Sequence, residues 1–371
     1  MPSYLPNCPS ADLLTFTAMR IGLIGRPASG KTSVFRILTG YSGDAPLHTS
    51  EPEVGVYLIP DARLEQVAQW AGCERRTPAT VELWDPPSHW SLQDGTAPRL
   101  IGELRTTDAL LHVLDLWGLD ILDPTEAVRR AEDLERTLIT ADLQVLQTRY
   151  QRLQQEYAKR HQEDLLKESQ SVSALLKCLQ AERPLRAEPW PQDVAHRMQG
   201  YGLLSAKPIF HLLNVAERHL GDAAVAATLQ MIVQRLPWAG TSYTSAHLEL
   251  ELVRMDPAER TEWQAVYGLS DLLPDRMAGP LLGALGFLRF YTVIGGEARA
   301  WLLPTGATAA QAAGRIHTDM ARGFIRAEVL NFREIGSVAS FHEARRQGRL
   351  RLEGRDYVVQ DGDILTVKFA V

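Results

Sequence analysis

Residues 25–32 read GRPASGKT and match the spacing GxxxxGK[ST] of a phosphate-binding loop, or P-loop. Glycines let backbone N–H groups close around phosphate oxygens, and the N-terminus of the following helix adds its dipole. Lys31 would bring a positive charge to the β- and γ-phosphates, and the Thr32 hydroxyl would bind Mg²⁺. The predicted phosphate contacts are Gly25, Arg26, Pro27, Ala28, Ser29, Gly30, Lys31, Thr32 and Ser33.

A second Mg²⁺ ligand is expected on a neighbouring strand, and Asp85 follows the apolar run 80–84. GTPases continue from this aspartate as DxxG, and the N–H of that glycine contacts the γ-phosphate. Here Pro86, Pro87 and Ser88 follow, so the glycine is missing. The alternative interpretation is that Asp85 is simply an acidic residue at the end of a strand.

The base of the nucleotide is expected beside residues 214–217, which read NVAE. GTPases carry NKxD here: the lysine stem stacks on the base, and the aspartate accepts hydrogen bonds from guanine. The valine removes that stem and the glutamate is one methylene longer, so a guanine clamp is weakened. The predicted base contacts are Asn214, Val215, Glu217, Ser245 and Ala246.

The elements that must position these motifs alternate between short apolar strands and helices. Strands are expected at 20–24, 54–59, 80–84, 109–114, 209–213 and 240–243, and helices at 31–38, 61–71 and 98–105. The strands are rich in Val, Ile and Leu on both faces, as buried parallel strands are. This order predicts an α/β fold with a doubly wound, mostly parallel sheet.

The alternation breaks after about residue 124, where apolar residues recur at helical spacing up to about residue 202. This pattern predicts an inserted arm of two antiparallel coiled-coil helices, and the alternative is a helix pair packed flat on the core. A third segment, with strands at 287–293, 298–303 and 358–369 and a helix at 308–318, fits a small β-grasp fold. The predicted organisation is an extension at 1–18, a G-type nucleotide-binding domain at 19–124 and 203–285, the helical arm at 125–202 and a C-terminal domain at 286–371.

The composition, with 45% hydrophobic and 23% charged residues, is that of an ordinary globular protein. No apolar run reaches the ~18 residues that a membrane span needs, so no membrane partner is expected. The three cysteines are widely spaced, which favours a reducing compartment and a cytoplasmic protein.

Residues 1–18 contain no Lys or Arg, so they lack the basic start of a signal peptide. We expect this extension to be poorly ordered and dispensable, with Met19 as the natural start.

Charge is distributed unevenly along the chain. Residues 286–371 carry 12 Lys and Arg against 9 Asp and Glu, whereas the remainder carries 27 against 36. A basic C-terminal unit hints at a polyanionic partner, although chance explains the difference equally well. Five arginines near the C-terminus either grip RNA phosphates or solvate a helix end, and the sequence favours neither interpretation. They are Arg345, Arg346, Arg349, Arg351 and Arg355.

With these motifs in place, the sequence resembles the YchF family of Obg-like ATPases from about residue 19 to the C-terminus. Besides NVAE, the resemblance is carried by PLHTSEPEVGV (46–56), PDARL (60–64), LITADL (138–143), RAWLLP (299–304), AQAAGRIHTD (310–319), GFIRAE (323–328) and YVVQDGD (357–363). It implies ATP (or GTP) and Mg²⁺ as cofactors, a preference for ATP over GTP, and Thr49 of the first switch segment as a further metal ligand. It also implies a C-terminal TGS domain that, with the arm, engages the ribosome or RNA without DNA specificity.

Departures from the family pattern concern hydrolysis more than binding. The family has DxAG followed by a long Gly-rich second switch, whereas residues 86–104 are shorter here. The histidine proposed as catalytic in the family has no counterpart in the loop 117–124, and His112 matches a different family histidine. His89 could act on water, but an isolated histidine is more often incidental, so the catalytic residues stay unassigned.

Three hypotheses for the function follow from these features. The first is an ATP-binding switch protein with slow ATPase activity that acts on the ribosome or RNA. The second is a pseudo-ATPase, a nucleotide-sensing scaffold that no longer hydrolyses. The third, a small-molecule kinase, is weak because nothing resembles a substrate lid. Turnover, with a Lys31→Ala variant as the blank, distinguishes the first two.

Overall fold

The computed structural model describes residues 19–40, 51–92 and 97–370, except for the side chain of Gln199. Within these ranges the chain forms two compact units. Unit 1 comprises residues 20–55 and 83–285, and unit 2 comprises residues 56–82 and 286–371. The sequence analysis assigned 56–82 to the nucleotide-binding domain, and its domain boundaries stay a prediction. Thr49 and the extension 1–18 lie outside the described residues.

A six-stranded sheet with the order β2-β4-β1-β5-β6-β7 carries the nucleotide motifs. Strand β1 pairs in parallel with β5, β5 with β6, and β6 with β7. Every residue of β6 is buried, as expected for a central parallel strand. The strands are β1 (Arg20–Ile24), β2 (Glu53–Leu58), β4 (Thr80–Asp85), β5 (Ala109–Asp115), β6 (Ile209–Asn214) and β7 (Gly240–Thr244). The chain adds strands on both sides of β1, which confirms the predicted doubly wound α/β fold.

Amphipathic helices cover this sheet and bury their apolar sides. Leu100 and Leu104 of α3, for example, join the core formed around Ile24 and Leu110. Besides the two helices of the arm, the α-helices of unit 1 are α1 (Lys31–Thr39), α3 (Ala97–Leu104), α6 (Gln192–Tyr201), α7 (Ala223–Arg235), α8 (Ala246–Arg254), α9 (Pro257–Val266) and α10 (Leu273–Ala284). Of these, α6 packs on the apolar core of the arm, and α9 has no buried residue. No helix in the described ranges is long and apolar enough to cross a membrane.

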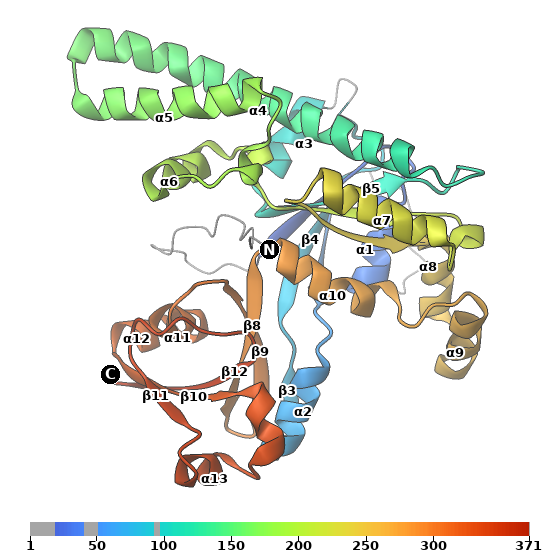
Figure 1. Ribbon diagram of the computed structural model, residues 1–371, viewed down its shortest axis with the longest axis vertical. Coiled ribbons are helices and arrows are strands. Elements are labelled where there is room, and N and C mark those ends of the chain that lie inside the picture. The colour runs from blue at the N-terminus through green and yellow to red at the C-terminus, as the bar shows by residue number, and fades with distance from the viewer. Residues whose placement is uncertain (1–18, 41–50, 93–96, 371) are drawn as a thin grey trace. The chain divides into compact units, whose positions relative to one another are not determined.

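The predicted helical arm is formed by α4 (Pro124–Arg160) and α5 (Glu163–Gln180), which run side by side in Figure 1. Helix α4 has 37 residues, so it extends about 55 Å at about 1.5 Å per residue. The Asp123 carboxylate caps its start by accepting a hydrogen bond from the Thr125 N–H. Apolar residues of α4 and α5, such as Leu146, Leu153 and Val172, form a buried core that Val194 and Met198 of α6 also join. The arm is therefore a helical hairpin with its own apolar seam.

Asp142 anchors the base of this arm. Its carboxylate is fully buried and accepts hydrogen bonds from the backbone N–H groups of Leu204 and Ser205 and from the Ser205 hydroxyl. The Arg105 guanidinium lies 2.9 Å from the same carboxylate, so the buried charge is paired as well as hydrogen-bonded. These contacts fix α4 to the end of α3 and to the chain segment that follows α6.

Unit 2 is built around a second six-stranded sheet with the order β11-β10-β12-β8-β9-β3. Its central strands β12 and β8 are parallel; β10 is antiparallel to β12 and β11, whereas β9 is antiparallel to β8 and parallel to β3. Its strands are β3 (Arg75–Thr77), β8 (Phe287–Ile294), β9 (Glu297–Pro304), β10 (Phe324–Asn331), β11 (Arg351–Glu353) and β12 (Asp363–Phe369). Its helices are α2 (Ala62–Ala71), α11 (Ala309–Ile316), α12 (Thr318–Arg322) and α13 (Phe341–Arg346). This mixed sheet with α11 across it agrees with the expected β-grasp fold.

The last strand is shorter than the expected 358–369. Val358 makes only an isolated bridge to Thr308, and β12 begins at Asp363 after a turn in which Gly362 has a φ of 90°. That φ lies in the left-handed region that favours glycine. Strand β10, which pairs with β12 over its whole length, was not expected as a strand from the sequence.

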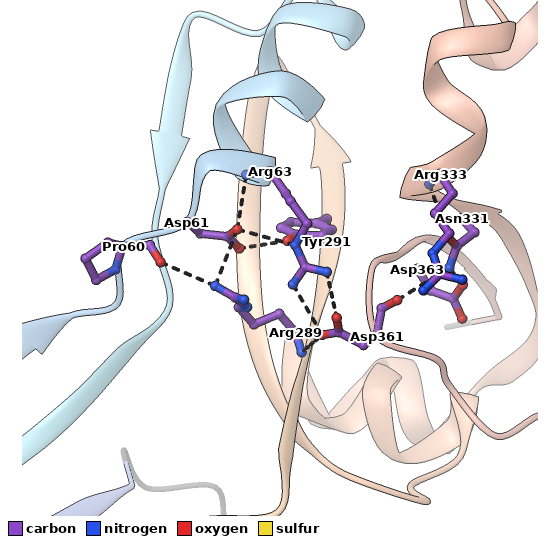
Figure 2. Close-up of polar contacts among 9 residues, drawn as sticks. All are labelled: Pro60, Asp61, Arg63, Arg289, Tyr291, Asn331, Arg333, Asp361 and Asp363. Carbon is purple, nitrogen blue, oxygen red and sulfur yellow. Dashed lines mark hydrogen bonds and ion pairs between the residues drawn. The ribbon is translucent and has the colours of Figure 1, made fainter. Parts of the chain in front are cut away.

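A polar cluster joins the segment around Asp61 to the rest of unit 2 (Figure 2). The Asp61 carboxylate caps α2 through the Arg63 N–H and accepts a 2.7 Å hydrogen bond from the Tyr291 hydroxyl. The Arg289 guanidinium lies 3.4 Å from the same carboxylate. Arg63 in turn donates two hydrogen bonds to Asp361, of 2.6 and 3.3 Å. These contacts explain why residues 56–82 group with the C-terminal segment.

Candidate nucleotide-binding site

The P-loop connects β1 to α1 and includes residues that tolerate an unusual backbone. Gly30 has a φ of 94°, and a Cβ atom there would lie 2.5 Å from the Asn214 Nδ2 atom. Glycine is therefore required at this position for two reasons, the backbone conformation and the close approach of the amide. Ala28 adopts a φ of 61°, which is uncommon for a residue with a side chain.

Lys31 begins α1, and its side chain folds back over the loop. Its ammonium donates hydrogen bonds to the carbonyl oxygens of Gly25, at 3.2 Å, and Arg26, at 3.0 Å. Burial lowers the pKa of this amine, and the nearby Asp85 carboxylate partly opposes that shift. A buried cation held only by neutral carbonyls is well suited to bind an anionic phosphate.

Thr32 and Asp85 form the predicted metal-binding pair. The Thr32 hydroxyl donates a 2.7 Å hydrogen bond to Asp85 Oδ2, although the two residues are far apart in the chain. Asp85 is only 3% exposed, and its Oδ1 has no hydrogen-bond partner among the described residues. Burial raises the pKa of this carboxyl to about 6, against the opposing effects of Thr32 and Lys31. A hydroxyl, a carboxylate and an unpaired buried oxygen are ligands that Mg²⁺ prefers, so the residues fit that ion.

Asn214 connects two loops of the site. Its amide nitrogen donates to the Ser29 carbonyl at 2.9 Å, and its amide oxygen accepts from the Ala246 N–H at 2.9 Å. It therefore links the P-loop to the loop between β7 and α8. Ser245 is buried just before α8, and its side chain makes no capping hydrogen bond there.

The remaining predicted base contacts differ in their surroundings. Val215 is 1% exposed and packs in the core with Leu114 and Leu213. Its side chain therefore anchors the loop after β6 to the core. Glu217 is partly exposed at the start of the short helix η3 (Glu217–His219). The carboxylate is thus available to solvent, whereas the valine is not.

Trp117, which the sequence analysis did not propose, lies directly against the P-loop. Its indole N–H donates a 3.3 Å hydrogen bond to the Ala28 carbonyl, and 49% of the side chain remains exposed. It follows the end of β5, the strand next to β1, so the sheet brings it beside the loop. An exposed tryptophan two residues after a buried strand was the available signal.

His89 and the C-terminal arginines have ordinary surroundings. The His89 ring is exposed and lies edge-on to Trp90, with a centroid distance of 6.4 Å. In unit 2, each of the five arginines near the C-terminus has a partner within that unit. The pairs are Arg345 with Glu328, Arg346 with Glu343, Arg349 with Ser337, Arg351 with Tyr357, and Arg355 with the Ala321 carbonyl.

Comparison with known proteins adds to this geometry. The family model YchF-GTPase_C, described as "Protein of unknown function (DUF933)", matches residues 287–370. The ribosome-binding ATPase YchF of Pasteurella multocida is 31% identical over 362 residues, which cover 95% of this chain and 99% of that protein. The chain belongs to the YchF family. Family relatives also include the ribosome-binding ATPase YchF of Bacillus subtilis, 27% identical over 95% of this chain and 100% of the relative.

A eukaryotic relative and a solved structure agree with this assignment. Obg-like ATPase 1 of Caenorhabditis elegans is 26% identical, over 95% of this chain and 92% of its own length. The structure of the Schizosaccharomyces pombe YchF GTPase superposes with a TM-score of 0.78, covering 96% of this chain and 99% of that one at 20% identity. This YchF-family chain therefore shares the whole fold, including the arm and the C-terminal domain, with that structure.

Proposed function

We propose that this chain binds ATP together with Mg²⁺, prefers ATP to GTP, hydrolyses it slowly and acts on the ribosome. The observation that carries the proposal is the cluster of Lys31, Thr32 and Asp85 at the N-terminus of α1. Lys31 would bind the β- and γ-phosphates, and Thr32 and Asp85 would hold Mg²⁺, which would supply positive charge to offset that of the phosphates. Thr49 is proposed as a further metal ligand from the family resemblance.

The proposed preference for ATP rests on the surroundings of the base contacts. A guanine site needs an acidic side chain at hydrogen-bonding distance and a surface on which the base stacks. Val215 is buried in the core and offers no such stem, and Glu217 replaces the shorter aspartate. The exposed ring of Trp117, held against the P-loop, is proposed to supply the stacking surface instead.

Slow hydrolysis is proposed because groups that would serve the transition state are missing. Ser88 stands where GTPases have the glycine that senses the γ-phosphate, and Pro86 and Pro87 stiffen the chain before it. Loss of water positioning typically lowers phosphoryl transfer by ~10³ or more. The alternative proposal is a scaffold that binds nucleotide without hydrolysing it.

The ribosome is proposed as partner because relatives that this chain matches over nearly their whole length are named ribosome-binding ATPases. The basic balance of residues 286–371 and the charged outer faces of the arm are suited to a polyanionic partner. No DNA specificity is proposed, and a cytoplasmic location follows from a ribosomal partner.

Single-turnover hydrolysis of Mg²⁺–ATP, with and without ribosomes, tests this function. We expect a rate far below ~1 s⁻¹, the lower end for working enzymes, without ribosomes. Lys31→Ala is the blank. A rate at or above ~1 s⁻¹ would contradict the slow-hydrolysis proposal, and no turnover above the blank would favour the scaffold.

A further inference from the structure

A small cavity opens beside the P-loop in unit 1. It has a volume of about 70 Å³ and lies between the start of the loop, the residues after Asp85, and one face of α4. This volume is sufficient for a few water molecules or one small oxyanion. The lining residues are Gly25, Arg26, Ser91, Leu92, His112, Arg130, Asp133, Leu134 and Thr137.

The cavity is positioned next to the expected phosphates. In open α/β sheets, ligands bind at the carboxyl ends of the strands. Strand β1 ends at Ile24, directly before Gly25, and His112 of β5 is the register partner of Ile24. The cavity therefore lies at the carboxyl edge of β1 and β5, against the loop that would hold the phosphates.

Arg130 is the cation that α4 contributes to this cavity. Its Nε donates a 2.7 Å hydrogen bond to Glu126, and its Nη1 donates to the Asp115 carbonyl at the end of β5. Nη2 has no hydrogen bond within the described part of the chain, and the side chain is largely buried. The guanidinium is thus held at the sheet edge, and one of its nitrogens is available to a ligand.

The other charged and titratable groups that line the cavity are Asp133, His112 and Arg26. Asp133 is already paired with Arg129 and Arg136, at 2.9 and 2.7 Å. His112 is neutral, because complete burial and the neighbouring His211 hold its pKa well below the usual value. Arg26 adds a second positive charge from the P-loop itself. Arg130 is itself paired with Glu126, at 2.7 Å, and lies 4.0 Å from the Asp115 carboxylate. An oxyanion in this cavity would therefore be held by the N–H donors of Arg130 and Arg26 rather than by an excess of positive charge.

We propose that Arg130 binds the terminal phosphate of ATP and thereby distinguishes ATP from ADP. This inference rests on the proposed nucleotide binding and assigns the γ-phosphate contact that Ser88 no longer provides in the manner of a glycine. A guanidinium is suited to this contact because it binds phosphate oxygens through charge-assisted hydrogen bonds. ADP, which lacks this group, would leave the cavity to water.

Calorimetric titration with Mg²⁺–ADP and with a non-hydrolysable ATP analogue tests the proposal. The variants are Arg130→Gln, Arg130→Lys and the control Arg152→Gln, an exposed arginine farther along α4 and outside the cavity. Arg130→Gln is expected to weaken binding of the analogue roughly 10- to 100-fold, the usual effect of losing a charged hydrogen bond, and to leave the ADP affinity within about two-fold. Arg152→Gln should change neither affinity.

The outcomes separate this inference from the proposed function. If the native chain binds neither nucleotide, the proposed function fails, and this inference fails with it. If the native chain binds both but Arg130→Gln keeps the same ratio of analogue to ADP affinity, only the Arg130 assignment is overturned. If Arg130→Gln also loses ADP, Arg130→Lys decides: a restored preference for the analogue supports the assignment, and binding of ADP without that preference, or of neither nucleotide, overturns it.

Discussion

Thr32 Oγ1 donates a 2.7 Å hydrogen bond to Asp85 Oδ2, while the buried Oδ1 of the same carboxylate has no partner in the described ranges. Without a metal, this arrangement is electrostatically unfavourable for the ionised carboxylate, and its pKa is raised to about 6. The same pair supplies two oxygen ligands at the N-terminus of α1. We therefore expect the ionised Asp85 carboxylate to destabilise the metal-free folded protein and to become favourable when it binds Mg²⁺.

The stability of the metal-free protein should depend on Asp85 protonation. Because the folded-state pKa of about 6 exceeds the ordinary 3.8, the folded chain binds this proton more tightly than the unfolded chain. The contribution is fully present below pH ~4 and is lost as the pH rises through 6, up to about 3 kcal/mol. Asp85→Asn should therefore be more stable than the native chain at pH 7.5 without Mg²⁺.

This difference in the free energy of unfolding can be measured by denaturant unfolding of the native chain and of Asp85→Asn between pH 4 and 7.5. Because the other titrating groups are the same in both proteins, their contributions cancel in the difference. Asp120→Asn, at an exposed surface position, is the control and should show no such trend. Mg²⁺ should stabilise the native chain with nucleotide but not Asp85→Asn. A stability difference that is independent of pH would contradict the assigned environment of Asp85.

Gly30 and Gly40 provide a matched test of the P-loop geometry. Both have positive φ values, 94° and 63°, but a Cβ atom meets Asn214 only at Gly30 and open space at Gly40. Gly40→Ala should lower the free energy of unfolding by about 1–2 kcal/mol from backbone strain alone. Gly30→Ala should lower the free energy of unfolding by more than Gly40→Ala does. It should also weaken nucleotide binding, measured by calorimetry, at least ~10-fold. Equal effects of the two substitutions would refute the close packing of Asn214.

Trp117 should contribute to base binding through its ring. A base stacked on an aromatic side chain typically gains about 1–3 kcal/mol of binding free energy. Trp117→Ala should therefore weaken ATP binding by that amount, and Trp117→Phe should weaken it by less. Trp263→Ala on α9, where the side chain is 46% exposed, is the control and should leave ATP affinity unchanged. If Trp117→Ala binds ATP as the native chain does, the stacking assignment is incorrect.

The polar cluster of Figure 2 predicts a large structural role for Asp61. Its side chain is 2% exposed, and alanine would remove the α2 cap and leave the buried Tyr291 hydroxyl without its acceptor. These losses together should lower the free energy of unfolding by about 2–4 kcal/mol. Glu65→Ala, which breaks the exposed pair with Arg76, should cost under about 1 kcal/mol. Comparable losses in thermal or denaturant unfolding would show that the cluster is not stabilising.

The sequence was sufficient to predict the features that depend only on residues close together in the chain. The spacing of Lys31 and Thr32 predicted a loop between a strand and a helix, and an apolar run ending in an acid predicted that Asp85 ends a strand, as it does in β4. The strands of the parallel sheet were predicted to within about one residue because Val, Ile and Leu fill both faces. Those features depend on neighbours in the chain, and no distant contact has to be known.

The sequence was insufficient where a role depends on distant partners. Trp117 reaches the P-loop only because β5 lies next to β1, and Arg130 of α4 shares a cavity with Gly25, although the two residues are far apart in the chain. The contact between Asp61 and Tyr291 joins residues 230 positions apart. Strand β10 carries charged Arg326 and Glu328, so its pattern did not stand out although it pairs between β11 and β12.

Calorimetric titration of the native chain with Mg²⁺ complexes of a non-hydrolysable ATP analogue and the matching GTP analogue tests the central claim most directly. The account predicts that the ATP analogue binds at least ~10-fold more tightly, about 1.4 kcal/mol, and that Lys31→Ala loses this binding. Tighter binding of the GTP analogue would contradict the assignment of the base contacts. Absence of binding by both analogues to the folded protein would contradict the nucleotide site itself.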